Sequence, residues 1–246
     1  MLRFRKAILL VHGFAGGNWD YGDLSNELQL YLDFDVYTFT LPGHDKSVIS
    51  GVTYEEWINA ACFQVDRLIK YGYKKIYVVG HSMGGVIASY LATRYKEIKK
   101  VVLAAPAFRY LSFDGEKIDL NGIGNSIKKT PKLIKAYSLE EVIARAFKMS
   151  LPASLEFSKL VKNHHNDPKN IDCPILIIQG LNDDMVPVDS SKYVYNSVKS
   201  KIKKVVYFEG VTHDIFQSDR KEEIYELVIR FFRDRYIKDN NTEKTI

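Results

Sequence analysis

Short apolar runs alternate with longer amphipathic stretches along most of the chain. The runs are rich in β-branched or aromatic residues and nearly continuous in apolar character, as expected for parallel strands covered on both faces. They are Ala7–Val11, Val36–Thr40, Ile76–Val79, Val101–Ala104, Ile175–Ile178 and Val205–Phe208. Strands that alternate with helical stretches predict an open, mostly parallel, doubly wound α/β sheet.

Two of the intervening stretches have clear helical signals. Between Thr53 and Tyr71 the apolar residues follow the helical period, and Thr53 with Glu56 matches a capping box. The last helix is predicted to open at Ser218 or Asp219. Its apolar face consists of Ile224, Leu227, Val228 and Phe231.

One segment breaks the alternation. No convincing strand lies between Ala105 and Pro174, and a structureless loop of that length is unusual in a compact domain. We therefore expect an inserted helical subdomain, with helices near 131–137, 139–149 and 152–163. The resulting division is a core over 1–107 and 170–237, an insertion over 108–169, and a polar, frayed C-terminal tail over 238–246.

Composition narrows the class of protein. With 246 residues, 46% hydrophobic and 26% charged, the chain is typical of a globular protein. It shows neither a membrane-spanning apolar run nor a signal-peptide core, so we expect a cytoplasmic protein without stable membrane insertion. The net charge of +5 comes mainly from 108–169, without the basic stripe and base-stacking aromatics of a nucleic-acid module. Cys62 and Cys173 indicate neither a disulfide framework nor a zinc site.

The strongest chemical signal is the pentapeptide Gly80-His81-Ser82-Met83-Gly84, between a predicted strand and a helix that opens at Met83. A serine on a tight strand-to-helix turn has a strained backbone and holds its hydroxyl above the sheet. Small residues two positions before and after it leave room for that turn. The motif therefore predicts Ser82 as a nucleophile.

A serine nucleophile needs a base, and the base needs an orienting acid. His213 follows the last predicted strand and precedes the last helix, at the sheet edge where ligands bind in open α/β folds. The acid should follow the preceding strand, where two adjacent aspartates compete. The spacing from Gly180 favours Asp183 over Asp184, which is interpreted as a solvated turn residue or a helper hydrogen bond.

The remaining requirement is an oxyanion hole made of backbone N–H donors. The amide of Met83 is one candidate. The second is the amide of Phe14, in the Gly-rich turn His12–Gly17 after the first strand. His12 and His81 flank the two turns and are predicted to be structural. Neither a G-x-G-x-x-G nor a Gly-Lys-Ser/Thr sequence supports a nucleotide site here.

Together these residues resemble the α/β-hydrolase family, in which the triad follows the chain order Ser, Asp, His. The chain is similar in size and insertion to small bacterial carboxylesterases and monoacylglycerol lipases. The resemblance implies a helical cap over 108–169 and, because the family's first two strands are missing, a six-stranded sheet. It also implies Ser82, Asp183 and His213 as the triad. The matching motifs are His12-Gly13-Phe14, Gly80–Gly84, Gly180…Asp183…Val186-Pro187 and Gly210-Val-Thr-His213.

The sequence thus predicts a serine hydrolase that cleaves carboxylic esters of small to medium acyl chains through an acyl-enzyme on Ser82. The expected partner is a small-molecule ester, and the chemistry needs no metal and no organic cofactor. A monoacylglycerol lipase, a thioesterase, a menaquinone-pathway-type lyase, a proline-type peptidase and a non-enzymatic receptor remain alternatives on the same fold. Thr40 and Asp45 replace an Asp and a Gly found in many relatives, so no subfamily's substrate is carried over.

Overall fold

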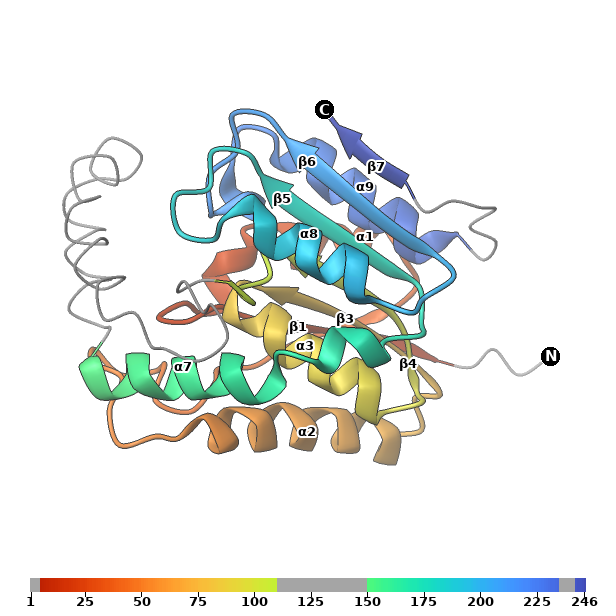
Figure 1. Cartoon of the computed structure of the whole chain (residues 1–246). Coiled ribbons are helices and arrows are strands. Elements are labelled where there is room, and N and C mark those ends of the chain that lie inside the picture. Colours follow the sequence, from red (N-terminus) through yellow and green to blue (C-terminus); the bar gives the residue numbers. More distant parts are fainter. Residues whose placement is uncertain (1–4, 110–149, 235–241) are drawn as a thin grey trace.

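The computed structural model describes residues 5–109, 150–234 and 242–246. Within these ranges seven parallel strands form one sheet in the order β2-β1-β3-β4-β5-β6-β7 (Figure 1). The mostly parallel sheet predicted from the apolar runs is therefore confirmed. The strands are β1 (Lys6–Val11), β2 (Asp35–Thr38), β3 (Lys75–His81), β4 (Ile98–Ala104), β5 (Ile175–Gly180), β6 (Lys203–Phe208) and β7 (Thr242–Thr245).

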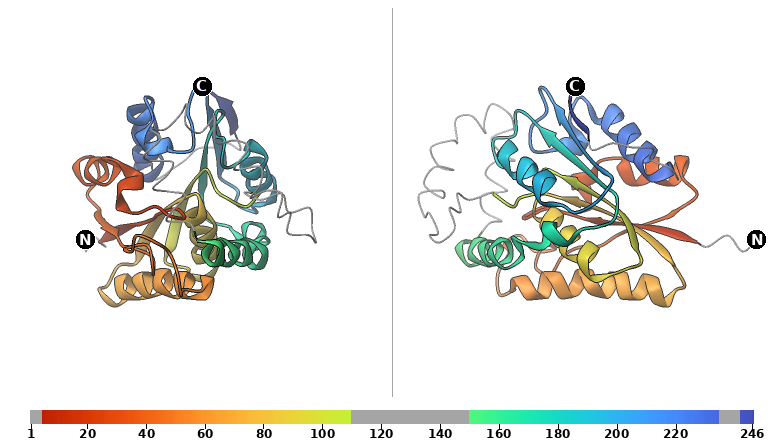
Figure 2. Two further views of the ribbon diagram at one scale, coloured as in Figure 1. Left: turned by 90° about the vertical axis from the view of Figure 1, so that its left-hand side faces the viewer. Right: turned by 45° about the vertical axis from the view of Figure 1, so that its right-hand side comes forward.

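Helices cover both faces of the sheet (Figure 2). One face packs against α2, α3, α7 and α8, and the other packs against α1 and α9. Among the described residues, three 3₁₀ turns lie in the connections: η1 (Asn18–Tyr21), η2 (Asp167–Asn170) and η3 (Ile215–Gln217). The helices of the described ranges are α1 (Leu24–Tyr31), α2 (Tyr54–Lys70), α3 (Met83–Arg94), α7 (Leu151–His164), α8 (Val188–Ser197) and α9 (Lys221–Arg233).

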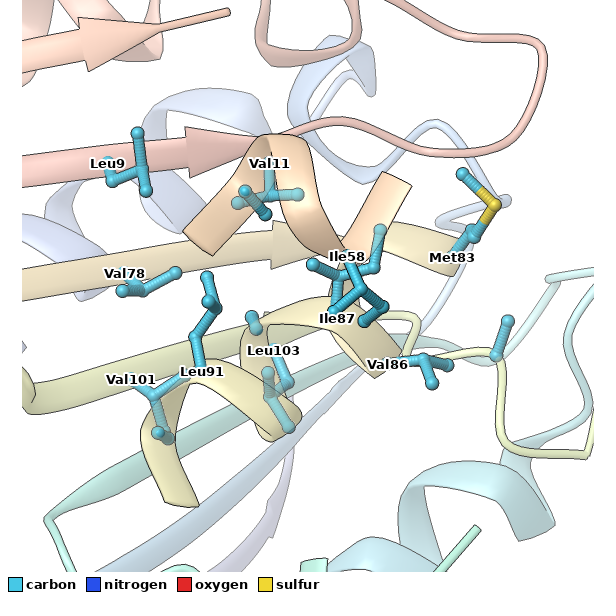
Figure 3. Close-up of a cluster of buried hydrophobic side chains, with 14 of the residues drawn as sticks. Leu9, Val11, Ile58, Val78, Met83, Val86, Ile87, Leu91, Val101 and Leu103 are labelled. Carbon is cyan, nitrogen blue, oxygen red and sulfur yellow. The ribbon is translucent and has the colours of Figure 1, made fainter. Parts of the chain in front are cut away.

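The alternation of side chains along each strand divides the core into two layers. On β1, Leu9 and Val11 join the cluster under α2 and α3, whereas Ile8 and Leu10 join the cluster under α1 and α9. All four are essentially inaccessible to solvent. Figure 3 shows the first layer, in which strand residues meet apolar side chains of α3. Because both faces of the sheet are buried, the strand sequences are nearly continuous runs of apolar residues.

The predicted helix signals agree with the structure at two sites and miss at a third. The capping box at the start of α2 is present, and the Thr53 N–H donates to Glu56 at 2.7 Å. The helix predicted over 152–163 is α7, where the Ser150 hydroxyl accepts the Ala153 N–H. The predicted start of the last helix is wrong, because Ser218 closes the 3₁₀ turn η3 and α9 begins at Lys221. The helices predicted over 131–137 and 139–149 lie outside the described residues.

The sheet has one strand more than the predicted six. Residues 242–245 were expected to belong to a frayed tail, but they form β7, which pairs with β6 from Lys204↔Thr242 to Tyr207↔Thr245. The backbone of Ile246 continues this pairing with Tyr207 and Glu209. The sequence Thr-Glu-Lys-Thr has no apolar pattern because an edge strand is held by main-chain hydrogen bonds while its side chains stay in water.

The strand order places a reversal point between β1 and β3. The chain moves outward from β1 to β2, then crosses back to add β3 on the other side of β1. In open α/β sheets, ligands bind beyond the carboxyl ends of the strands at such a point. The Gly-rich turn after β1 and the Ser82 turn after β3 therefore meet at the position where a site is expected.

Candidate active site

Ser82 occupies the turn between β3 and α3 in a left-handed backbone conformation, with φ 54° and ψ −118°. Such a conformation costs a non-glycine residue roughly 1–3 kcal/mol. Gly80 and Gly84 are required because neighbouring backbone atoms leave no room for a side chain at either position. A Cβ on Gly80 would lie 2.3 Å from the Gly84 carbonyl oxygen, and one on Gly84 would lie 1.9 Å from the Val11 carbonyl oxygen. The sharp turn predicted from the pentapeptide is therefore present.

His213 and Asp183 meet across two neighbouring loops that follow β6 and β5. The Nδ1 atom of His213 lies 2.9 Å from Oδ2 of Asp183. Asn182, the residue before Asp183, links the two loops by hydrogen bonds. Its N–H donates to the Val211 carbonyl and its side-chain oxygen accepts the Gly210 N–H, each at 3.0 Å. The spacing argument that favoured Asp183 over Asp184 therefore agrees with the geometry.

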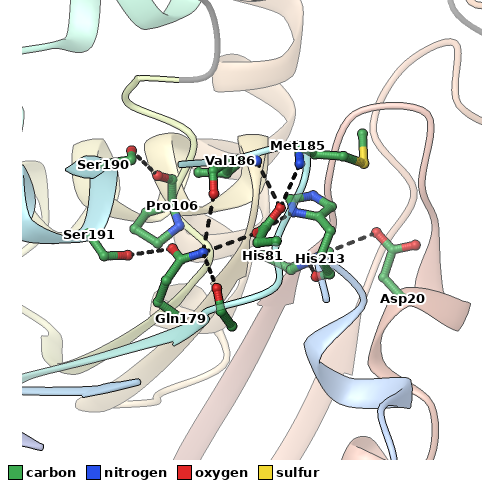
Figure 4. Close-up of polar contacts among 11 residues, drawn as sticks. Asp20, His81, Pro106, Gln179, Met185, Val186, Ser190, Ser191 and His213 are labelled. Carbon is green, nitrogen blue, oxygen red and sulfur yellow. Dashed lines mark hydrogen bonds and ion pairs between the residues drawn. The ribbon is translucent and has the colours of Figure 1, made fainter. Parts of the chain in front are cut away.

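The Asp183 carboxylate is buried but surrounded by donors, among them His213, Gln179 and the backbone of Met185, which Figure 4 labels. Oδ1 accepts the N–H groups of Met185 and Val186, both at 2.8 Å, and Oδ2 accepts the Gln179 amide at 3.1 Å. Burial alone would raise the pKa of Asp183, but the charge and hydrogen bond of His213 and the two backbone donors hold it below its ordinary value.

The ionised carboxylate also fixes the tautomer of the histidine. A carboxylate can only accept, so Nδ1 of His213 carries a proton, and in the neutral form of the ring the lone pair is on Nε2. His213 is 4% exposed and lines the same cavity as Ser82. The ring therefore presents a basic nitrogen to that cavity, as a general base requires.

Gln179, at the end of β5, is a residue of the site that the sequence analysis did not single out. Its side chain is completely buried. The Nε2 group donates to Asp183 and lies 3.2 Å from the Gly180 carbonyl and 3.3 Å from the Val186 carbonyl, while Oε1 accepts the Ser191 hydroxyl at 2.7 Å. A lone glutamine that ends the apolar run Ile-Leu-Ile-Ile was the signal available in the sequence.

The two predicted oxyanion donors lie on the turns that enclose the site. Met83 is the first residue of α3, a position whose N–H has no acceptor within its own helix. Phe14 lies in the turn after β1, where the Gly16 N–H donates back to the Gly13 carbonyl at 3.2 Å. The Phe14 ring stacks on Phe157 of α7, with ring centroids 5.2 Å apart, and this contact holds the turn in place.

A small cavity of about 50 Å³ joins these groups. Ser82, His213 and the turn at Phe14 line it, together with Met185 and Phe157. Asp183 lies behind His213, and Met83 follows Ser82 directly in the chain. The structure thus brings together all five residues that the sequence singled out.

A further histidine of this region, His12, makes structural contacts. The His12 ring contacts the Gly13 carbonyl through Nδ1 at 2.9 Å and accepts the Leu41 N–H through Nε2 at 3.0 Å, which fits its predicted structural role.

Among the described residues, no group of three or more histidine, cysteine, aspartate or glutamate side chains could hold a metal ion. No helix in the described ranges is long and apolar enough to span a bilayer.

Proteins with similar sequences include several named as esterases or lipases. The family described as "Serine aminopeptidase, S33" matches residues 3–220. The chain is 24% identical over 235 residues to a carboxylesterase of Bacillus subtilis, with 92% of each chain covered. It is also 24% identical over 234 residues to a thermostable monoacylglycerol lipase of Bacillus sp. strain H-257, which covers 92% of this chain and 89% of the lipase.

Solved structures share the fold. The crystal structure of the monoacylglycerol lipase of Paleococcus ferrophilus superimposes with a TM-score of 0.69 at 21% identity, over 93% of this chain and 95% of the lipase. This likeness includes the parallel sheet with helices on both faces described above. The family match spans most of the sequence, from β1 to the turn before α9. The chain therefore belongs to the serine aminopeptidase S33 family of α/β hydrolases.

Proposed function

We propose that the chain is a serine hydrolase that cleaves carboxylic esters of small to medium acyl chains through an acyl-enzyme on Ser82. One observation carries the proposal: Ser82 and His213 line one cavity, and the buried Asp183 carboxylate lies 2.9 Å from the far nitrogen of the His213 ring. The similarity to proteins named carboxylesterase and monoacylglycerol lipase favours an ester over a peptide bond as the substrate.

The geometry translates into a sequence of steps. His213 takes the Ser82 proton on Nε2 as the hydroxyl oxygen attacks the ester carbonyl. Asp183 holds the imidazole in the required tautomer and stabilises the imidazolium that forms. The amides of Phe14 and Met83 donate to the oxyanion of the tetrahedral intermediate. The imidazolium then protonates the leaving alcohol, and a water deprotonated by His213 releases the acid. No step uses a metal or an organic cofactor.

The acyl group is proposed to lie under a cap formed by the insertion 108–169, above the core 1–107 and 170–237. Support comes from α7, the described helix of this segment. Its Phe157 lines the cavity, and its Glu156 carboxylate accepts the Tyr54 N–H of α2 at 3.1 Å. The insertion therefore supplies part of the apolar wall that an acyl chain would contact.

Hydrolysis of p-nitrophenyl esters from acetate to palmitate tests the proposal, with wild type and Ser82→Ala measured side by side. We expect activity that peaks at a short or medium chain and falls by roughly 10⁴- to 10⁶-fold in Ser82→Ala, as for loss of other triad nucleophiles. Ser89→Ala is the matched control, because Ser89 is a buried serine of the helix that follows Ser82, and its hydroxyl donates to the Gly85 carbonyl.

The outcomes separate the proposal from its alternatives. Folded wild-type protein that is inert toward every ester refutes the esterase function. Cleavage of prolyl p-nitroanilides in place of the esters would instead support a peptidase, and preference for acyl-thioesters would support a thioesterase. Ester hydrolysis that survives in Ser82→Ala would contradict the assignment of the nucleophile.

A further inference from the structure

A second pair of an aspartate and a histidine lies beside the first. Asp20 belongs to the 3₁₀ turn η1, and His81 is the last residue of β3, directly before Ser82. Their side chains are 7% and 3% exposed, and Oδ2 of Asp20 lies 3.6 Å from Nδ1 of His81. Figure 4 shows Asp20 on the opposite side of His213 from Gln179, and His81 beside His213. The steps proposed above do not use either side chain.

Asp20 folds the turn that carries one of the oxyanion donors. Its two carboxylate oxygens accept separate backbone groups of that turn, Oδ2 from the Gly13 N–H at 3.0 Å and Oδ1 from the Gly17 N–H at 3.2 Å. The fit is tight, because a Cβ on Gly16 would lie 2.0 Å from the same carboxylate. The position of the Phe14 amide, between Gly13 and Gly16, is therefore set by Asp20.

His81 contacts the loop that carries the proposed base. Its Nε2 lies 3.0 Å from the His213 carbonyl oxygen, and the two rings lie with centroids 4.9 Å apart. A carbonyl oxygen only accepts, so Nε2 of His81 is the protonated donor. Since His81 is bonded to Ser82 through the chain, one imidazole adjoins the nucleophile, the base loop and, through Asp20, the oxyanion turn.

The charges of the pair support each other within the protein. Burial alone would lower the pKa of His81, but Asp20, together with Asp214 and the His213 carbonyl, raises it above its ordinary value. Burial alone would raise the pKa of Asp20, but His81, His12 and the Gly13 N–H lower it to about 2. Each member of this buried ion pair is also hydrogen-bonded to the surrounding backbone, Asp20 to Gly13 and Gly17 and His81 to the His213 carbonyl, which gives the pair one well-defined geometry and suits a positioning role.

We propose that Asp20 and His81 are positioning residues, which together fix the Phe14 amide and the His213 backbone relative to Ser82 for the attack on the carbonyl. The inference rests on the esterase function proposed above. Both residues line the cavity beside Ser82 and His213, but the proposed steps use neither side chain. Their loss should therefore weaken binding of the transition state much more than binding of the ester.

Three substitutions divide the pair into its parts. In His81→Gln the amide nitrogen can still donate to the His213 carbonyl, but the contact with Asp20 is lost. His81→Asn keeps the contact with Asp20, because its amide group overlaps Nδ1 of the original ring, but it loses the donor to the His213 carbonyl. Asp20→Asn removes the charge and one of the carboxylate acceptors. Tyr21→Phe is the matched control, since the Tyr21 hydroxyl makes a buried hydrogen bond to the Val79 carbonyl from the same 3₁₀ turn.

Each protein is titrated with a fluorophosphonate to count its reactive Ser82, so misfolded molecules are excluded from every rate. We then measure kcat and KM with the preferred p-nitrophenyl ester, and the inhibition constant of an alkylboronic acid, which mimics the tetrahedral intermediate. We expect kcat per titrated site to fall roughly 10- to 100-fold in the three variants, with KM nearly unchanged. The boronate inhibition constant should rise by the same factor, and Tyr21→Phe should match wild type in both.

Wild-type kcat and boronate affinity per titrated site in the Asp20 and His81 variants would overturn the positioning role, even if these proteins melt at a lower temperature. If Asp20→Asn yields no titratable protein, the two His81 variants decide the question. Failure of the esterase proposal is a different result: wild type itself would neither hydrolyse esters nor react with the fluorophosphonate at Ser82, and the positioning role would be refuted along with it.

Discussion

Replacing Asp183 by asparagine changes little in size but reverses the hydrogen bonding at the base. The carboxylate accepts four hydrogen bonds, two at each oxygen. Asparagine offers one oxygen and one NH₂ group. Its oxygen belongs at the Oδ1 position, because the two donors there are backbone amides that cannot turn. The NH₂ group then points at Gln179 and at Nδ1 of His213.

Neither neighbour can adapt without loss. Rotation of the Gln179 amide would place its oxygen against the carbonyls of Gly180 and Val186, which now lie 3.2 Å and 3.3 Å from Nε2. His213 can accept a hydrogen bond at Nδ1 only by moving its proton to Nε2, and then it cannot take the proton of Ser82. We therefore expect kcat to fall by roughly 10⁴-fold, or about 5 kcal/mol in activation free energy.

The assay is steady-state hydrolysis of the preferred p-nitrophenyl ester by Asp183→Asn and Asp184→Asn, with circular dichroism melts to verify folding. Asp184→Asn is the matched control, because it removes the adjacent charge in the same loop, and it should stay within a few-fold of wild type. An Asp183→Asn protein that is folded and within 10-fold of wild-type kcat would refute the tautomer argument. Loss of activity in Asp184→Asn alone would assign the acid to Asp184.

Three further predictions concern stability and selectivity. The pKa of Asp20 is about 2 in the folded protein against 3.8 ordinarily, so the stability that its charge contributes is complete above pH 4 and is lost as pH falls through 2. This contribution amounts to about 2 kcal/mol, so the urea midpoint of Asp20→Asn should fall less on acidification than that of wild type. Phe157→Ala should cost about 3–5 kcal/mol and shift the ester series toward longer chains, so an unchanged chain-length profile would contradict its place in the cavity. Gly84→Ala should cost about 3 kcal/mol or more, and a near-wild-type melting temperature would contradict the close approach to β1.

The parts of the site that could be read from the sequence are those with local constraints. The turn that carries Ser82 is specified by five consecutive residues. Asp183 and His213 could be placed because each follows a recognisable apolar strand, and the carboxyl ends of parallel strands meet at one edge. The strand order that brings these carboxyl ends together is set by the handedness and short length of the connections, and no single residue encodes it.

The parts that escaped prediction depend on contacts between distant segments. Asp20 lies 61 positions before His81, in a short 3₁₀ turn without hydrophobic periodicity, so nothing local distinguishes it from a solvated turn residue. Gln179 resembles any polar residue at the end of a strand until Asp183 and Ser191 are placed around it. His81 was predicted to be structural, and its contact with the His213 carbonyl became visible only in three dimensions.

The added strand β7 has a consequence for how the molecule behaves in concentrated solution. Without it, the apolar strand β6 would present its free N–H and C=O groups to other molecules, and such an edge is a template for intermolecular sheet growth. β7 occupies those groups and replaces them with a four-residue edge of threonine, glutamate and lysine, while β2 ends the sheet on the other side with four residues that begin at Asp35. Short, charged borders of this kind discourage aggregation, so the long apolar strands that carry the chemistry remain shielded in the middle of the sheet.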